Sequence, residues 1–228
     1  MTDETAMDLL RSPPRRPRRP AAVERRTQAE RSAETQRKLI DAAIAVLHRV
    51  GYGATTTGLI ADEAGVSRGA MLHQYPTKVD MMLAVVADVY DHETKEYRRL
   101  GAEAASPRDR FYKFPDMMWE VLTRPSAMAV LEIMMGSRSD PELASRLGPL
   151  QRWIEQASRA TVEQALREGG FPDLPEANAM RRLFVAAVRG LSIDLMLLED
   201  RAELDQAIEL LKRLLRALSD GLVPPTRE

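Results

Sequence analysis

The stretch that decides the fold is residues 51–78, which read GYGATTTGLIADEAGVSRGAMLHQYPTK. Two short apolar helical segments flank Gly65, and glycine supplies the positive φ that a tight turn between two helices needs. Small Ala61 and Ala64 let the second segment cross close to the first, and Ser67 is placed to cap it. The spacing predicts a helix-turn-helix whose second helix could enter a DNA major groove. On spacing alone, an ordinary helical hairpin inside a bundle remains the alternative.

The sequence on both sides of this stretch also predicts helices. Apolar residues recur at three- and four-residue steps from Glu34 to Val50, and Thr77 is placed to cap a long helix that follows. No run of alternating β-branched residues argues for a sheet. The expected fold class is all-α, with a three-helix helix-turn-helix domain over residues 31–78 joined to a larger helical domain over residues 79–222.

The formal net charge of −1 hides an uneven distribution of charge. Residues 11–78 carry 13 Lys and Arg against six Asp and Glu, whereas residues 79–228 carry 20 against 25. A basic front joined to an acidic body indicates two tasks in one chain, with nucleic acid as the expected partner of the front.

Several functional classes find no support in the sequence. The 228 residues contain no cysteine, which excludes disulfides, Cys-ligated zinc and a thiol nucleophile. His48, His73 and His92 are too scattered for a metal site, and there is no nucleophile elbow or Gly-rich phosphate loop. No apolar run approaches the ~20 residues of a membrane span, and no hydrophobic leader is evident. We therefore expect a cytoplasmic protein without metal, cofactor, membrane partner or enzymatic activity.

Residues 1–30 are predicted to form a disordered basic arm. Four prolines among residues 11–20 remove backbone donors and force extended backbone, and the arginines between them repel one another. Such an arm is either a solvated tail, a product of translation from an upstream start codon, or a source of extra phosphate and minor-groove contacts on DNA.

The motif resembles the TetR family of bacterial transcriptional regulators from about residue 33 to 83. The resemblance rests on Thr-Thr-x-x-x-Ile-Ala at 56–57 and 60–61, Ala-Gly-Val-Ser-x-Gly at 64–69 and aromatic-Pro-Thr-Lys at 75–78. It implies an all-α homodimer whose three N-terminal helices bind a double-stranded DNA operator, while the larger domain binds a small effector and dimerises.

The function that the resemblance implies is a ligand-responsive transcriptional regulator. We expect a repressor that binds a palindromic operator as a dimer and is released by a small-molecule effector. A TetR-like activator, or a regulator controlled by a protein partner without a small ligand, is the first alternative. A helical enzyme or carrier with vestigial DNA binding is the second.

Carried over position by position, the resemblance implies a set of DNA contacts. Arg68 stands where the family often reads a base, and arginine suits the O6 and N7 atoms of guanine. Leu72 replaces a frequent tyrosine, which removes one hydrogen bond, and Lys78 matches a common phosphate contact. The expected DNA-binding residues are Thr55, Thr57, Ser67, Arg68, Gly69, Ala70, Leu72, His73, Gln74 and Lys78.

Methionines concentrate between residues 117 and 135, near Trp119 and Trp153. They are either core filler, since methionine packs irregular gaps, or the lining of an adaptable pocket for a small apolar or amphipathic effector. The expected pocket residues are Met117, Glu120, Met128, Met134, Met135 and Trp153.

The last two expected helices each carry an apolar stripe. These stripes either pack inside one subunit or join two subunits, and the need for two DNA-binding heads favours a four-helix dimer interface. The expected interface residues are Leu183, Ala187, Gly190, Ile193 and Leu197 on the first helix and Leu204, Ile208, Leu211 and Leu215 on the second.

Overall fold

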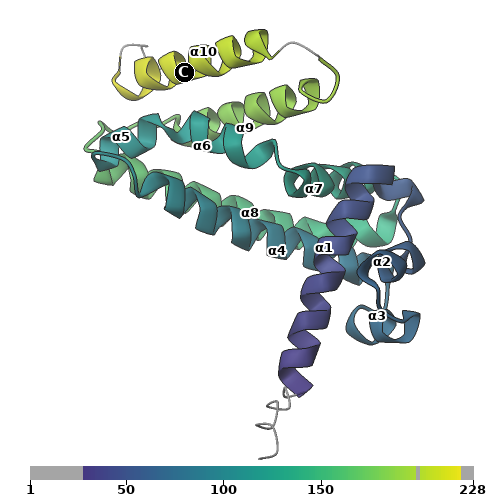
Figure 1. Cartoon of the computed structure of the whole chain (residues 1–228). Helices are drawn as coiled ribbons and strands as arrows, with labels where there is room; N and C mark the ends of the chain where they lie inside the picture. The colour runs from purple at the N-terminus through teal and green to yellow at the C-terminus, as the bar shows by residue number, and fades with distance from the viewer. Residues whose placement is uncertain (1–27, 199–200, 222–228) are drawn as a thin grey trace, which may run out of the picture.

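The computed structural model describes residues 28–198 and 201–221, and every regular element within these ranges is a helix. The expected all-α fold class is confirmed. In chain order (Figure 1) the helices are α1 (Gln28–Ala54), α2 (Thr57–Ala64), α3 (Arg68–Gln74), α4 (Lys78–Gly101), α5 (Pro107–Tyr112), α6 (Phe114–Leu122), α7 (Pro125–Gly136), α8 (Pro141–Glu168), α9 (Ala177–Asp194) and α10 (Ala202–Ser219).

The first helix begins earlier than its apolar periodicity indicates. It starts at Gln28, so residues 28–30 of the expected arm are helical, and residues 1–27 of that arm lie outside the described residues. Gly51, with φ +72°, interrupts α1 before its last turn. A residue with a side chain is strained at this φ, so the glycine allows the chain to change direction just before α2.

Local capping rules account for the turns of the motif. Gly65 ends α2 in the left-handed conformation at φ +64°, and its N–H donates to the carbonyls of the last turn. The Ser67 hydroxyl then accepts a hydrogen bond from Ala70 N at 3.1 Å and begins α3. Thr77 and Asp80 form a reciprocal capping box at the start of α4, as their spacing predicts.

The described chain packs around two hydrophobic cores. The first joins α1, α2, α3 and the first half of α4 to α7 and the first turns of α8, with Leu39, Ile60, Met71 and Ile133 completely buried. The second lies among α5, α6, the rest of α8, α9 and α10. The boundary between the two cores therefore does not fall at residue 78, because α7 and the start of α8 share the core of the helix-turn-helix.

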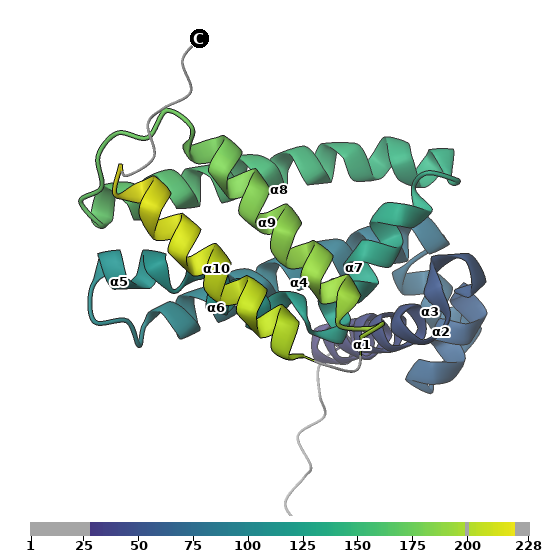
Figure 2. The ribbon, with the colours of Figure 1, turned by 90° about the horizontal axis from the view of Figure 1, so that it is seen from above.

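Two views place the later helices relative to the motif. Helices α2 and α3 lie at one end of the molecule, and α10 forms its outermost layer on another side (Figure 1). Seen from above, α9 and α10 cross in front of α4, α6 and α8 (Figure 2). The molecule thus presents the motif and the last two helices on different surfaces.

Candidate nucleic-acid interface

Helix α3 is anchored on its inner side and exposed on its outer side. Met71 is completely buried on its inner side. The outer side carries Ser67, Arg68, Gly69, Leu72 and His73, all of which are exposed. Leu72 is 48% exposed, so an apolar side chain lies on this outer face. An exposed apolar side chain beside an arginine is suited to base edges, where thymine offers a methyl group and guanine two acceptors.

The guanidinium of Arg68, the expected base-reading residue, lies beside Gly58 of α2. The Arg68 guanidinium lies 3.5 Å from the place that a Cβ atom on Gly58 would occupy. That distance is an ordinary van der Waals contact, so the guanidinium packs beside Gly58 on the surface between α2 and α3.

The structure corrects the expected role of one threonine. Thr55 is 1% exposed, and its hydroxyl donates to the carbonyl oxygen of Gly51 at 2.7 Å, so it does not face a phosphate. Thr57 is half-buried in the first turn of α2. Thr56, which sequence reasoning missed, is exposed and caps α2 by accepting from Leu59 N at 3.2 Å. Threonine directly before a helix is a typical N-cap, so this signal was present in the sequence.

Two further expected contacts are turned toward the protein. The Gln74 amide donates to the Ser32 hydroxyl at 3.0 Å and accepts from the Gln36 amide at 3.0 Å, which ties α3 to α1. Lys78 Nζ donates to the carbonyl oxygen of Tyr52 at 2.7 Å and lies 3.8 Å from the centre of the tyrosine ring. Burial lowers the pKa of Lys78. In this conformation Gln74 and Lys78 are thus engaged within the protein, and their contact with DNA stays a prediction. Ala70 is half-buried beside them.

Charge in the basic front is concentrated ahead of the motif. Residues 28–78 carry six Lys and Arg against five Asp and Glu, whereas seven arginines fall between residues 11 and 26. The described helix-turn-helix is thus close to neutral, and the basic excess belongs to residues outside the described ranges.

The six expected pocket residues are not brought together. Met117 is buried, and Met128 and Met134 are half-buried on α7. Met135 and Trp153 are 52% and 57% exposed, and their place in an effector pocket stays a prediction. Trp153 stands edge-on to Tyr90, with ring centres 5.4 Å apart. Glu120 is exposed as well, and it accepts a hydrogen bond from Arg124 at 3.0 Å.

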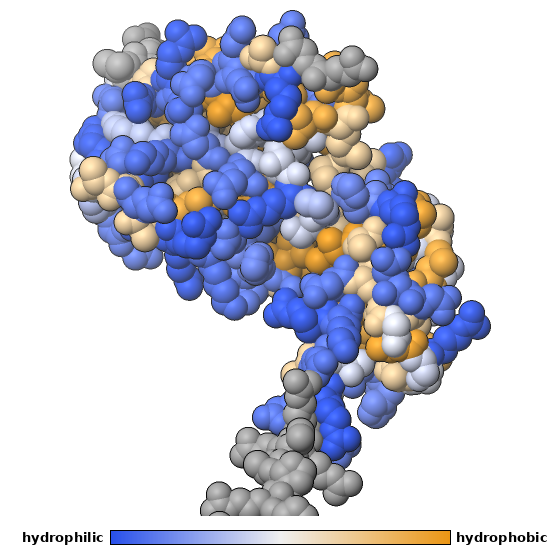
Figure 3. Space-filling view, in the orientation of Figure 1, coloured by the Kyte–Doolittle hydropathy of each residue, from blue (hydrophilic) through white to orange (hydrophobic). Residues whose placement is uncertain are grey.

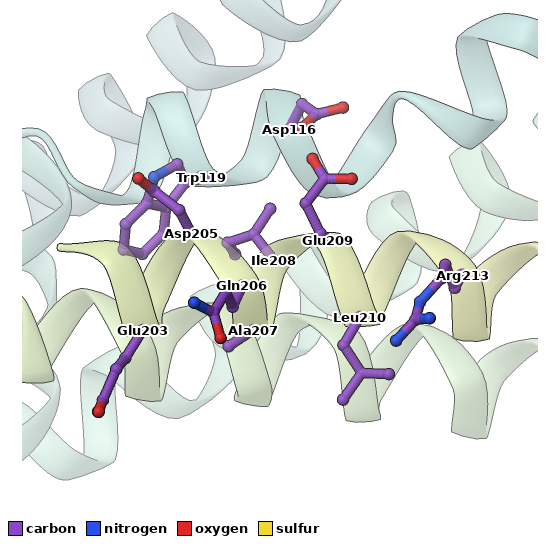
Figure 4. Close-up of a pocket in the computed structure, with 10 residues that line it drawn as sticks. All are labelled: Asp116, Trp119, Glu203, Asp205, Gln206, Ala207, Ile208, Glu209, Leu210 and Arg213. Carbon is purple, nitrogen blue, oxygen red and sulfur yellow. The ribbon is translucent and has the colours of Figure 1, made fainter.

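An open groove of about 800 Å³ lies instead between α6 and α10 (Figure 4). Trp119 and Ile208 give it an apolar floor, and Lys212 bridges the carboxylates of Asp116 and Glu209 at 3.1 and 2.7 Å. None of the expected pocket residues lines this groove. Sequence reasoning missed it because the charged residues of an amphipathic helix usually face solvent, which hides a groove beside them. Its lining residues are Asp116, Trp119, Glu203, Asp205, Gln206, Ala207, Ile208, Glu209, Leu210 and Arg213.

The apolar stripe of α9 faces outward, as a subunit interface requires. Leu183 is 62% exposed, and Gly190, Ile193 and Leu197 are exposed along the same face or just beyond it. Ala187 is half-buried at the edge of this stripe. Figure 3 shows apolar surface around the turn that follows α9, where Met196, Leu197 and Leu198 are exposed.

The expected stripe of α10 is corrected by the structure. Leu204, Ile208 and Leu215 are buried, the last two in the second core of their own subunit, and Leu211 is half-buried. The exposed leucines of this helix are Leu210 and Leu214. Helix α10 is apolar over a wide arc, so its sequence pattern did not decide which leucines turn inward.

The described residues hold neither a helix that could span a membrane nor a cluster of metal-ligating side chains. None of their helices is both long and apolar enough to cross a membrane. Within the same ranges, no group of three or more His, Cys, Asp or Glu side chains is arranged to hold a metal ion.

Comparison with known proteins shows similarity to transcriptional regulators in both halves of the chain. Residues 39–85 match the family model of bacterial regulatory proteins of the tetR family, and residues 107–220 match the model described as BetI-type transcriptional repressor, C-terminal. The HTH-type transcriptional regulator CymR of Pseudomonas putida is 31% identical over 186 residues, which cover 80% of this chain and 89% of that protein.

Solved structures share the fold at low sequence identity. A TetR transcription regulator from Haloarcula marismortui has a TM-score of 0.64 at 21% identity, covering 82% of this chain and 98% of its own. A transcriptional regulator from Rhodococcus sp. Rha1 also has a TM-score of 0.64 at 21% identity, with coverage of 83% and 99%.

Proposed function

Because the chain belongs to the TetR family of bacterial regulatory proteins, we propose that it is a dimeric transcriptional repressor that a small-molecule effector releases from its operator. The family consists of DNA-binding transcription regulators that act as dimers, not of enzymes. The matched description of the C-terminal half as that of a repressor supports repression over activation.

The observation that carries the proposal is the exposed face of α3. Arg68, Leu72 and His73 project from a helix that the Ser67 cap, the left-handed Gly65 and buried Met71 hold in place. The N-terminal residues of such a helix meet base edges when it enters a major groove. Arg68 is proposed to read guanine, Leu72 to contact a thymine methyl group, and Ser67, Gly69 and His73 to contact the backbone or neighbouring bases.

We assign dimerisation to the exposed face of α9 together with Leu210 and Leu214 of α10. Small residues in the middle of the α9 stripe allow two helices to approach closely. A two-fold axis through this face would pair two heads, so the operator should contain two half-sites about 34–36 Å apart or a multiple of that distance.

Effector binding is proposed to act through the second core. A small apolar or amphipathic ligand there would release DNA only by its difference in affinity between two conformers of the dimer. Helix α4 is suited to carry the change, because Val79 and Met82 pack in the first core and Tyr97 packs against the second. Action on chromosomal DNA would place the protein in the bacterial cytoplasm.

Replacing Arg68 by alanine tests the proposed base contact. We expect Arg68→Ala to relax specificity at one position of each half-site, at a cost of about 1–3 kcal/mol in operator binding. The measurement is the affinity of wild type and variant for operators carrying each of the four base pairs at every position.

Arg159→Ala is the matched control for this experiment. It removes the same charge from an exposed site on α8, and its binding profile should equal that of the wild type. If Arg68→Ala weakened all base variants by the same factor, Arg68 would be a phosphate contact and not a base reader.

A further inference from the structure

Tyr52 joins four helices where the helix-turn-helix meets the rest of the chain. Its hydroxyl donates to Asp140 Oδ2 at 2.6 Å, and its backbone N–H donates to Glu132 Oε2 at 3.0 Å. Its carbonyl oxygen accepts the Lys78 ammonium, which also lies over its ring. Through its backbone, ring and hydroxyl, this one residue at the end of α1 therefore contacts the start of α4, the end of α7 and the cap of α8.

The surrounding backbone is shaped to receive this tyrosine. A Cβ atom on Gly136 would lie 2.3 Å from the Tyr52 ring, so only glycine at the end of α7 leaves space for it. Gly51 adopts a positive φ, and a Cβ atom there would lie 3.0 Å from the Glu132 carboxylate. Any side chain at position 136 would push the ring out of its place between α7 and α8.

The electrostatics of the junction are consistent with a tight contact. Tyr52 is 7% exposed, and burial followed by the hydrogen bond to Asp140 raises its pKa. The pKa of Asp140 is lowered by the backbone N–H of Leu143 and by Tyr52. A second ion pair lies beside the junction, where Arg146 of α8 binds Asp80 of α4 at 2.7 Å.

We propose that Tyr52, Lys78, Glu132 and Asp140 form a latch that makes the DNA-reading head, α7 and the first turns of α8 one rigid unit. The latch sets the angle of α3 relative to the body, and through the dimer it sets the separation of the two recognition helices. This inference rests on the proposed function as a dimeric operator-binding protein. In this scheme Lys78 is a positioning residue, and movement of α7 or α8 reaches α3 through Tyr52 as well as along α4.

Loss of the latch should reduce discrimination between operators with different half-site spacings. A general structural role of Tyr52 would not cause this effect. Two heads held at fixed angles accept only one spacing between half-sites, whereas loosened heads adapt to several. A charge-assisted hydrogen bond of this kind is worth roughly a factor of ten or more in an equilibrium. We expect Tyr52→Phe to weaken binding to the correctly spaced operator about tenfold and to leave binding to unrelated duplex DNA unchanged.

The experiment uses an operator that the wild-type dimer selects from a pool of random duplexes. Versions with one or two base pairs added or removed between the half-sites are then compared for each variant. The matched control is Tyr112→Phe, because Tyr112 donates to Asp220 at the same 2.6 Å but lies far from the junction. Tyr112→Phe should keep the spacing preference of the wild type, and Tyr52→Phe should reduce it about tenfold.

Asp140→Asn completes a double-mutant cycle. Asparagine caps helices as well as aspartate does, so the start of α8 is retained while the bond to the tyrosine is weakened. The effects of Tyr52→Phe and Asp140→Asn on spacing preference should be less than additive, because both remove the same bond. Full additivity, or an unchanged preference in Tyr52→Phe, would overturn the latch.

Hydrogen exchange tests the latch without DNA. In the free protein, Tyr52→Phe should speed exchange in peptides covering residues 44–60 and 132–146 about tenfold, and Tyr112→Phe should not. Unchanged exchange in both variants would overturn the latch even if the wild type selected a palindrome. Faster exchange in Tyr52→Phe would support it even if the wild type selected none, in which case the proposed function alone would fail.

Discussion

Replacing Gly190 by glutamate is expected to convert the dimer into folded monomers and to lower operator affinity at least a hundredfold. A Cβ atom at Gly190 meets nothing within 4 Å inside the subunit, so the subunit should accept a larger side chain. Helix propensity even favours the change by up to about 1 kcal/mol. At a close contact between two copies of α9, however, the same side chain would place bulk and a buried charge in the interface.

The expected loss of operator affinity follows from the linkage of two DNA-binding domains in one dimer. Linked binding sites gain a factor of about 10²–10⁴ over a single site, and a monomer loses this gain. Analytical ultracentrifugation gives the mass, thermal unfolding gives the fold, and titration gives the operator affinity. Ala160→Glu, at an exposed position of α8, is the control for added charge. A dimeric Gly190→Glu protein with operator affinity within tenfold of wild type would exclude α9 as the interface.

The second large effect is a dependence of stability on pH that arises from Glu93 on α4. Burial raises the pKa of Glu93 to about 7, against the opposing influence of Arg189 and Arg124. The folded protein therefore holds this proton more tightly than the unfolded chain, whose carboxyl has a pKa of 4.5. The resulting stabilisation is complete below pH 4.5 and is lost as the pH rises through 7.

The magnitude is about 2–3 kcal/mol, since each pKa unit corresponds to about 1.4 kcal/mol and the side chain keeps some contact with solvent. Urea unfolding of wild type and Glu93→Gln between pH 5 and 8 measures it. As the pH rises, the unfolding free energy of the wild type should fall by this amount relative to that of Glu93→Gln. Glu142→Gln, at an exposed position of α8, is the control, and its unfolding free energy should depend on pH in the same way as that of the wild type. Parallel curves for Glu93→Gln would show that Glu93 is ionised in the folded protein throughout this range.

Local rules were enough to predict the helix-turn-helix. Gly65, Ser67 and Thr77 act on backbone groups within three or four residues of themselves, so their roles can be read from spacing alone. The exposed face of α3 follows from the same rules, because buried Met71 fixes which side of a seven-residue helix turns outward.

The features that local rules could not predict involve partners that lie far apart in the chain. Lys78 binds a carbonyl 26 residues earlier, and Gln74 binds a hydroxyl 42 residues earlier, so no local pattern could show that these side chains are occupied. Helix α7 is apolar on most of its surface, which left the orientation of Met135 undetermined. In both cases the tertiary packing decides which polar or apolar groups remain available for a partner.

The most direct test of the central claim is capture of sheared genomic DNA from the source bacterium by the purified protein, with Arg68→Ala in parallel. The account predicts that the wild type enriches a two-fold symmetric sequence whose half-sites lie about one helical turn, or a multiple of it, apart. Arg68→Ala should enrich related sites in which one base pair of each half-site is no longer fixed. Enrichment of no symmetric sequence by the wild-type dimer would contradict the account.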